Sequence, residues 1–134
     1  MAAHDGTGYK VDFASLGWNT WAGELPGRVK VAREAGQQVR LIELGPGFVE
    51  PDWCERGHIV YVVSGRYMQQ VGTETWEMQT GQALILPPDT RHRSRNTGSL
   101  AAVVFVVDQD DPSAEENAPA SGATASTADD EANA

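Results

Sequence analysis

The sequence predicts an all-β fold in which two antiparallel sheets pack together as a small barrel. Short segments rich in β-branched and aromatic residues recur about 8 to 12 residues apart, and Gly, Pro, Asp or Asn separate them. Helical periodicity is weak: the stretch VKVAREAGQQV is the best candidate for a short helix, and its Gly36 would interrupt it. Regularly spaced short strands with turn signals between them are typical of β-sandwiches and barrels.

The expected strands occupy the middle of the chain. They read, in order, RVKVAR, QQVRLIEL, HIVYVVSG, RYMQQVG, TETWEMQ, ALILP, HRSRN and SLAAVVFVVD. Residues 1–27 combine Gly and Pro with Trp18 and Trp21, so we expect a loop or edge segment that packs on the barrel and covers one end of the core with the two rings. The barrel itself is expected over residues 28–108.

Residues 109–134 are expected to form a disordered acidic tail. This stretch has no aromatic and no β-branched aliphatic residue, so it cannot bury enough apolar surface to offset the entropy of ordering it. It holds seven acidic residues and no basic one, which accounts for most of the net charge of −9 and leaves about −2 for the rest of the chain. The acidic balance argues against nucleic acid as an obligatory partner, because the phosphate backbone would be repelled.

The location expected from the sequence is the cytoplasm, without a membrane partner. No apolar stretch approaches the ~20 residues that span a bilayer, and the start of the chain lacks the apolar core of a signal peptide. Cys54, the single cysteine, cannot form an internal disulfide, so its thiol is buried, reactive or bound to metal.

The stretch DWCERGH holds a first group of candidate functional residues. Asp52, Cys54 and His58 share one parity and would face one side of a regular strand. Four residues of extended strand span about 13 Å, whereas donor atoms on one ion lie within about 4 Å of one another. Cys54 and His58 can therefore share an ion only if the intervening ERG bends. Gly57 is the residue able to adopt the unusual backbone angles that such a bend requires.

The stretch GQALILPPDTRHRSRN holds a second group. A strand ends at a Pro pair, turns at Asp89 and enters a strand in which His92, Ser94 and Asn96 share one face and three arginines share the other. We expect His92 to face inward, because three arginines inside a small barrel would carry a prohibitive desolvation cost.

These two stretches resemble the two sequence motifs of the cupins. The second motif, G-x5-P-x-G-x2-H-x3-N, is read here as Gly81, Pro87, Asp89, His92 and Asn96, with Asp in place of the middle glycine. The first, H-x-H-x3-E-x6-G, keeps its spacing as Asp52, Cys54, His58 and Gly65. The resemblance implies a cupin-like double-stranded β-helix, or jelly-roll barrel, of two packed antiparallel sheets.

The resemblance also implies a metal site near the barrel axis. Position by position, the family's ligands correspond to Asp52, Cys54, His58 and His92, of which His92 alone keeps the usual residue type. Thiolate and imidazole favour Zn²⁺ or Fe²⁺, and Mn²⁺ or Ni²⁺ are compatible with the set. As an enzyme, such a protein would be a metal-dependent dioxygenase, isomerase or lyase acting on a small polar molecule, carboxylate or sugar-like.

Alternative interpretations of these residues stay open at this point. The lumen could instead form a metal-free, non-catalytic module that binds or senses a small molecule. In that account His58, His92, Ser94, Asn96 and Arg66 would supply hydrogen bonds, and Tyr61 would also contact the molecule. Cys54 could also be a small buried hydrophobe beside a hydrogen-bonded histidine. A thiol nucleophile would use a Cys–His pair as well, but the sequence offers no evident third group to orient the histidine.

The run HIVYVVSG predicts a homodimer. Ile59, Tyr61 and Val63 alternate with equally apolar residues, so both faces of this strand are apolar. Since the outer face of a barrel normally meets water, we expect a second sheet or a second subunit to pack there.

Overall fold

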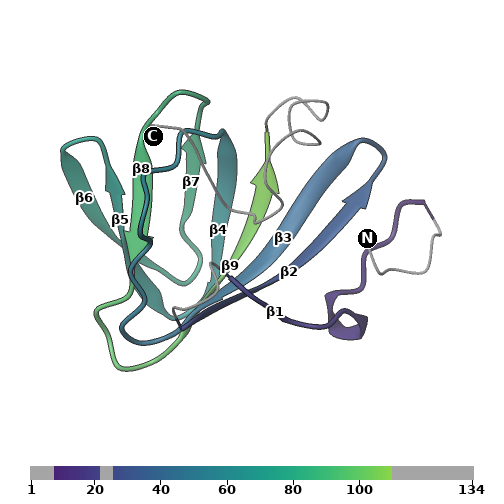
Figure 1. Ribbon diagram of the computed structural model, residues 1–134, viewed down its shortest axis with the longest axis horizontal. Helices are drawn as coiled ribbons and strands as arrows, with labels where there is room; N and C mark the ends of the chain where they lie inside the picture. Colours follow the sequence, from purple (N-terminus) through teal and green to yellow (C-terminus); the bar gives the residue numbers. More distant parts are fainter. Residues whose placement is uncertain (1–7, 22–25, 110–134) are drawn as a thin grey trace.

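The computed structural model describes residues 8–21 and 26–109. Nine strands and one 3-10 helix occur in these ranges, and Figure 1 shows their arrangement. The elements are η1 (Phe13–Ser15), β1 (Asn19–Thr20), β2 (Gly27–Glu34), β3 (Gln37–Leu44), β4 (His58–Ser64), β5 (Arg66–Val71), β6 (Glu74–Gln79), β7 (Ala83–Leu86), β8 (His92–Arg95) and β9 (Ala102–Asp108).

The strands form two sheets, and every pairing between named strands is antiparallel. One sheet has the order β1-β2-β3-β9-β4-β7 and the other β6-β5-β8. In Figure 1 the three-stranded sheet stands at one side and the β2–β3 hairpin at the other, with β4, β7 and β9 between them. The predicted all-β fold of two antiparallel sheets is confirmed. Because β9 lies between β3 and β4, it brings residues from three distant parts of the sequence side by side.

The core lies between the two sheets and follows the period-2 pattern of the strands. Along β9, buried residues alternate strictly with partly buried ones, and Val104 and Val106 face inward. On β4 the inward residues are His58, Val60 and Val62. The same buried cluster also includes Trp21, Val29, Ile42, Leu44, Phe48, Tyr67, Met78, Leu86 and Ala102.

The stretch that offered a short helix forms a β-hairpin instead. β2 and β3 pair along their whole length, from Gly27 opposite Leu44 to Glu34 opposite Gln37. The turn between them places Ala35 at φ 53° and Gly36 at φ 76°, which are left-handed angles that suit a tight hairpin turn and not a helix.

Two residues of the motifs occupy backbone positions that explain their identity. Gly65 has φ +82°, and a Cβ added there would lie 2.6 Å from the carbonyl oxygen of Ala101, so only glycine fits. Asp89, at the position where the cupin motif has glycine, has φ 69°. Asp is one of the few other residues that adopt left-handed angles at low cost, so the turn before β8 is kept.

The N-terminal segment packs against the large sheet. Phe13 meets Phe105, on the outer face of β9, edge to face at 6.1 Å between ring centroids, and Lys30 Nζ donates to the Phe13 carbonyl at 2.7 Å. Trp21 is buried and stacks on Phe48 at 5.1 Å, as expected for a ring that covers the edge of the core. Trp18 lies under Lys30 and a neighbouring arginine.

The outer face of β4 and β7 is apolar and open in the single chain. Tyr61 is 46% exposed, Val63 44% and Ile85 76%. The expected second sheet does not cover this face within the described residues. The boundaries 1–27, 28–108 and 109–134 stay predictions, and the expected tail from residue 110 onward falls outside the described residues.

The part of the chain that the structure describes contains no helix long and apolar enough to cross a bilayer.

Candidate metal centre

The segment before β4 pairs with β8 and contains a wide bulge. Glu50 N donates to the Ser94 carbonyl at 2.9 Å, and Cys54 and His92 exchange two backbone hydrogen bonds, at 2.8 and 2.9 Å. Two residues of β8 therefore oppose four residues of the incoming chain. The extra residues bulge outward, and the side chain of Asp52 among them is exposed. Asp52 and Cys54 were expected to face the same side, but that holds only in a regular strand, and the bulge interrupts the strand between them.

Between Cys54 and His58 the chain bends, as predicted. Cys54 Sγ lies 3.5 Å from His58 Nε2, far less than the span of an extended segment. The bend is held by the backbone, since Asp89 N donates to the Glu55 carbonyl at 2.8 Å. Gly57 serves the bend differently from the prediction: its φ lies outside the left-handed region, but a Cβ there would lie 2.9 Å from the Pro88 ring. Close approach of Pro88 is the reason for glycine.

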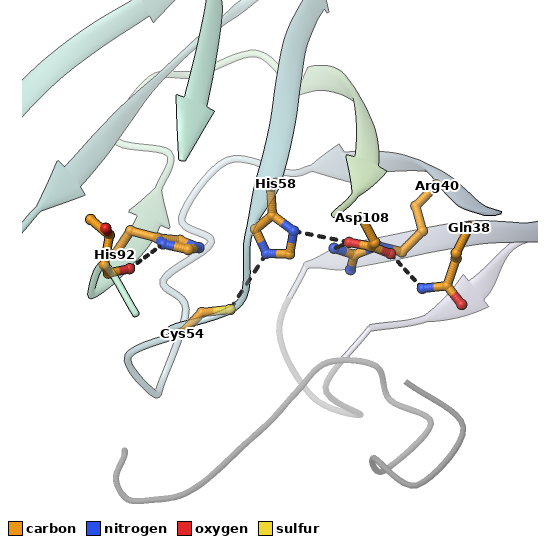
Figure 2. Close-up of polar contacts among 7 residues, drawn as sticks. Gln38, Arg40, Cys54, His58, His92 and Asp108 are labelled. Atoms are coloured by element: carbon orange, nitrogen blue, oxygen red, sulfur yellow. Dashed lines mark hydrogen bonds and ion pairs between the residues drawn. The ribbon is translucent and has the colours of Figure 1, made fainter. Parts of the chain in front are cut away.

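The bend completes a cluster of three candidate metal ligands. One ligand atom from each of Cys54, His58 and His92 lies within 4.8 Å of the other two. His58 is the first residue of β4 in the large sheet and His92 the first of β8 in the small sheet, so the cluster joins the two sheets. The imidazole centroids are 5.1 Å apart and the rings are nearly perpendicular, at 75°. Figure 2 shows Cys54 and His58 in contact, with His92 on the other side of Cys54.

His58 is oriented by Asp108, which the pairing register places beside it. β9 runs between β3 and β4 with Asp108 directly opposite His58 on one side and Gln38 on the other. His58 Nδ1 lies 2.9 Å from Asp108 Oδ1, and Arg40 Nη2 lies 2.8 Å from the same oxygen (Figure 2). Gln38 Nε2 donates to the other oxygen.

The charge state of Asp108 follows from these contacts. Burial alone would raise its pKa, but the Arg40 charge and the hydrogen bonds from His58 and Gln38 outweigh burial and hold the pKa well below its usual range. Asp108 is therefore a carboxylate at neutral pH. A carboxylate can only accept, so His58 carries its proton on Nδ1 and presents the lone pair of Nε2 to Cys54.

His92 has the corresponding tautomer. Its Nδ1 lies 2.9 Å from the Thr90 carbonyl oxygen, which can only accept, so Nδ1 carries the proton. Its Nε2 is buried and has no hydrogen-bond partner within the described residues. Burial, with a contribution from the nearby His58, lowers the pKa of His92 to about 3, so the ring is neutral at physiological pH. A neutral imidazole with Nδ1–H bonded to protein and a bare Nε2 is the form that binds metal ions.

The thiol of Cys54 is protonated when no cation is beside it. Burial, and secondarily the charge of Glu50, raise the pKa of Cys54 to about 12. A divalent ion binds the thiolate and not the thiol, so ion binding here would displace a proton. Once that proton is displaced, the donor set fits a divalent metal: one thiolate sulfur and two oriented imidazoles, of which the His92 ring has a buried Nε2 without a hydrogen-bond partner among the described residues.

The cluster borders a partly open cavity of about 70 Å³. Its polar lining includes Glu50, Arg40 and Ser94 in addition to the cluster, and its apolar lining includes Trp21, Ile42, Leu44, Val60, Leu86, Val104 and Val106. Glu50 was not among the predicted site residues. Ser94 N and Oγ donate to Glu50 Oε1 at 3.0 and 3.1 Å, and burial raises the pKa of Glu50 to about 7. The sequence held only a weak signal for Glu50, because the bulge breaks the alternation between Glu50 and Cys54 and the motif spacing drew attention to Asp52.

The predicted ligand-binding residues lie in different places. Ser94 lines the cavity, whereas the other three are not among its lining residues. Asn96 is buried, but its Nδ2 donates to the carbonyls of Leu44 and Leu100, both at 2.9 Å, so it ties loops together. Tyr61 lies on the outer face of β4, and Arg66 is exposed with its guanidinium 3.5 Å from Glu77.

The two sequence motifs implied a cupin barrel. The structure agrees: it is a small barrel in which one histidine from each sheet lies beside a cavity. The family model of the cupin domain matches residues 40–108, just over half of the chain. The chain belongs to the cupin family.

Individual proteins are also similar to this chain. A stretch of 43 residues is 42% identical to protein SchB of Streptomyces halstedii, covering 32% of this chain and 31% of that protein. A cupin 2 conserved barrel domain protein from Salinispora arenicola superposes with a TM-score of 0.60 at 18% identity, over 75% of this chain and 86% of that one. A sugar phosphate isomerase of the cupin superfamily from Silicibacter pomeroyi reaches 0.65 at 17% identity, over 75% of each chain. At these identities the solved structures support the fold alone.

Proposed function

We propose that this protein is a metal-binding cupin whose cavity holds a small polar molecule next to the metal. The observation that carries the proposal is the Cys54, His58 and His92 cluster, whose ligand atoms lie within 4.8 Å of one another. The two histidines have their Nδ1 atoms engaged by Asp108 and the Thr90 carbonyl. Engagement of Nδ1 orients each Nε2 for a ligand bond, and no other role for the buried Nε2 of His92 is evident among the described residues.

The donor set favours Zn²⁺ or Fe²⁺, with Mn²⁺ and Ni²⁺ as weaker candidates. A thiolate with two imidazoles suits the borderline-soft ions, whereas Mn²⁺ prefers oxygen ligands. Three protein ligands would leave a coordination position for a water or a substrate oxygen, which is the arrangement of catalytic sites. A metal bound there would supply Lewis-acid polarisation of that oxygen.

Asp52 is left out of the proposed ligand set. Its side chain is exposed on the bulge, and it does not belong to the cluster of ligand atoms. Glu50, four residues before Cys54, supplies a cavity carboxylate instead. For the bound molecule we propose contacts with Ser94, which lines the cavity; contacts with Arg66, Asn96 and Tyr61 stay predictions that their positions do not favour.

The reaction, if the protein is an enzyme, would belong to the metal-dependent dioxygenase, isomerase or lyase types that the family resemblance implied. The fold hosts many chemistries and selects none of them. A cytoplasmic location is part of the proposal.

The second candidate function is a metal-free module that binds a small molecule. The observation that favours it is the direct contact of Cys54 Sγ with His58 Nε2 at 3.5 Å, in which the neutral thiol can donate a hydrogen bond.

Metal content separates the two candidates. Protein purified without added metal should be offered Zn²⁺, Fe²⁺, Mn²⁺ and Ni²⁺ separately, dialysed, and measured by elemental analysis. We expect about one equivalent of Zn²⁺ or Fe²⁺ per chain, given the free energies typical of thiolate and imidazole sites. Retention below about 0.1 equivalent of every ion would reject the metal-binding proposal in favour of the metal-free module.

We also propose that the protein is a homodimer. The exposed apolar side chains Tyr61, Val63 and Ile85 lie on neighbouring strands, on one face of the large sheet. A second copy could cover this face without obstructing the cavity, which lies on the opposite, inner face.

A further inference from the structure

Two charged side chains line the cavity next to the metal cluster, and each has a polar atom without a protein partner among the described residues. Arg40, on β3, is buried, and its Nε has no hydrogen-bond partner within the described ranges. Glu50 accepts from Ser94 with Oε1 at both of its side-chain hydrogen bonds, which leaves Oε2 without a donor in the same part of the chain. A buried donor without an acceptor is costly, so a guest of matching polarity would be stabilised.

Arg40 presents a fixed positive donor to the cavity. Its Nη2 is held by Asp108 at 2.8 Å, on a residue that is itself buried and ionised. That contact fixes one edge of the guanidinium, while Nε–H is buried and has no acceptor within the described residues. Because the group is cationic and buried, its best acceptor is an anionic oxygen such as a carboxylate.

Glu50 presents an acceptor, or a shared proton, to the same cavity. The Ser94 hydrogen bonds fix its carboxyl group; burial raises its pKa to about 7, although these hydrogen bonds and the charge of Arg40 act in the opposite direction, so the ionised form prevails only above that pH. An ionised Oε2 can only accept, so the complementary group on a guest is a hydroxyl that donates.

We propose that Arg40 and Glu50 form a two-point recognition site for a small hydroxy carboxylate, with the carboxylate on the Arg40 guanidinium and the hydroxyl on Glu50 Oε2. The inference deepens the proposed function and rests on its claim that the cavity binds a small polar molecule.

The size and the charge of the cavity narrow the class of ligand further. A cavity of about 70 Å³ has room for a few water-sized groups, and so for a molecule of about four to six non-hydrogen atoms. A simple carboxylate has no hydroxyl to donate to Oε2 of Glu50. A neutral diol would offer the Arg40 guanidinium only an uncharged acceptor, which forms a weaker hydrogen bond than a carboxylate. A hydroxy acid with two or three carbons satisfies both side chains.

The test compares three probes of similar size: glycolate, which has a carboxylate and a hydroxyl; acetate, which lacks the hydroxyl; and ethylene glycol, which lacks the carboxylate. Affinities are measured by titration calorimetry on metal-free and Zn²⁺-treated protein. We expect glycolate to bind about tenfold or more tightly than either analogue in both preparations, the value of one charge-assisted hydrogen bond. Equal affinities for glycolate and acetate, or Kd values above about 10 mM for all three probes, would overturn the proposal.

The variant Glu50→Gln keeps the shape of the side chain and removes its charge. We expect the preference for glycolate over acetate to fall below about threefold, since a charge-assisted bond becomes a neutral one. The matched control Glu55→Gln changes an exposed carboxylate of the same segment and should keep the full preference. A preference retained in Glu50→Gln would refute the role of Glu50.

A second measurement does not depend on a variant. The side-chain Nε–H resonance of Arg40 in ¹⁵N-labelled wild-type protein should shift when glycolate is added, and an unmoved resonance at saturation would overturn the assignment. These results also separate this inference from the proposed function. If the protein retains metal but does not prefer glycolate to acetate, only this inference is refuted. If the protein prefers glycolate to acetate but does not retain metal, only the metal-binding proposal is refuted.

Discussion

His58 Nδ1 lies 2.9 Å from Asp108 Oδ1, across the β4–β9 pair in which the two residues stand directly opposite each other. This contact turns the other nitrogen of His58 toward Cys54 Sγ, 3.5 Å away. Asp108 in turn is held by Arg40 and Gln38 from β3. The geometry of the Cys54, His58 and His92 cluster thus depends on Asp108, a carboxylate that contacts only His58 among the three.

The variant Asp108→Asn should weaken metal binding and destabilise the fold. Loss of an outer carboxylate partner typically costs 10- to 100-fold in metal affinity, about the loss we expect here. Removing the charge also leaves buried Arg40 uncompensated, at about 3–5 kcal/mol of unfolding free energy. Zn²⁺ competition titrations and urea unfolding measure the two effects. The control Asp52→Asn alters an exposed carboxylate outside the cluster and should change neither; equal effects in both variants would contradict the assignment.

Metal affinity should fall as the pH falls. Cys54 has a pKa of about 12 without metal, so each binding event displaces a thiol proton, whereas His92, with a pKa of about 3, is already neutral. The apparent dissociation constant should therefore rise about tenfold for each unit of pH lowered between about 6 and 8. Zn²⁺ competition titrations at several pH values measure the slope. The slope should flatten in Cys54→Ser, and a pH-independent affinity in the wild type would show that the thiolate is not a ligand.

The variant Gly57→Ala should displace the bend that joins Cys54 to His58. The added Cβ would lie 2.9 Å from Cδ of the Pro88 ring, which has little freedom to move. We expect about 1–3 kcal/mol of lost stability from the overpacking, together with weaker metal binding. Gly17→Ala, where nothing lies within 4 Å of an added Cβ, is the control for urea unfolding and Zn²⁺ titration. Wild-type stability and affinity in Gly57→Ala would mean that the close approach does not hold the bend.

The variant Ile85→Lys should dissociate the proposed dimer. A lysine charge in the centre of an apolar interface is not compensated, whereas the same charge at the exposed Leu100, in the loop before β9, should be tolerated. Sedimentation velocity should give a dimer for the wild type and for Leu100→Lys, and a monomer for Ile85→Lys. A monomeric wild type would end the dimer proposal.

Local sequence patterns predicted much of the fold and part of the candidate site. Alternation along the strands predicted the sheets, and motif spacing predicted that Cys54, His58 and His92 lie together. The place of Asp52 was beyond such reasoning, because it depends on a bulge in which four residues oppose two on β8. The periodicity of one segment does not show which residues of a distant strand lie opposite it.

The sequence did not point to Arg40 and Asp108 for the same reason: their place depends on the pairing of distant strands. Arg40 and Asp108 reach the site through the pairing of β3, β9 and β4, which joins segments about 20 to 70 residues apart. Asp108 carried a local signal nonetheless, since it continues the inward parity of Val104 and Val106 at the end of an apolar strand. A buried carboxylate at the end of a core strand needs partners, and here those partners are His58, Arg40 and Gln38.

The absorption spectrum of the protein with one equivalent of Co²⁺, which replaces Zn²⁺ in such sites, reports on the metal centre itself. We predict an intense near-ultraviolet thiolate-to-cobalt charge-transfer band, together with visible bands of a four- or five-coordinate ion. The charge-transfer band should be lost in Cys54→Ser, the visible bands weakened in His92→Ala, and both kept in the exposed-site control Arg91→Ala. A wild-type spectrum identical to that of aqueous Co²⁺ would show that Cys54, His58 and His92 do not hold a metal ion.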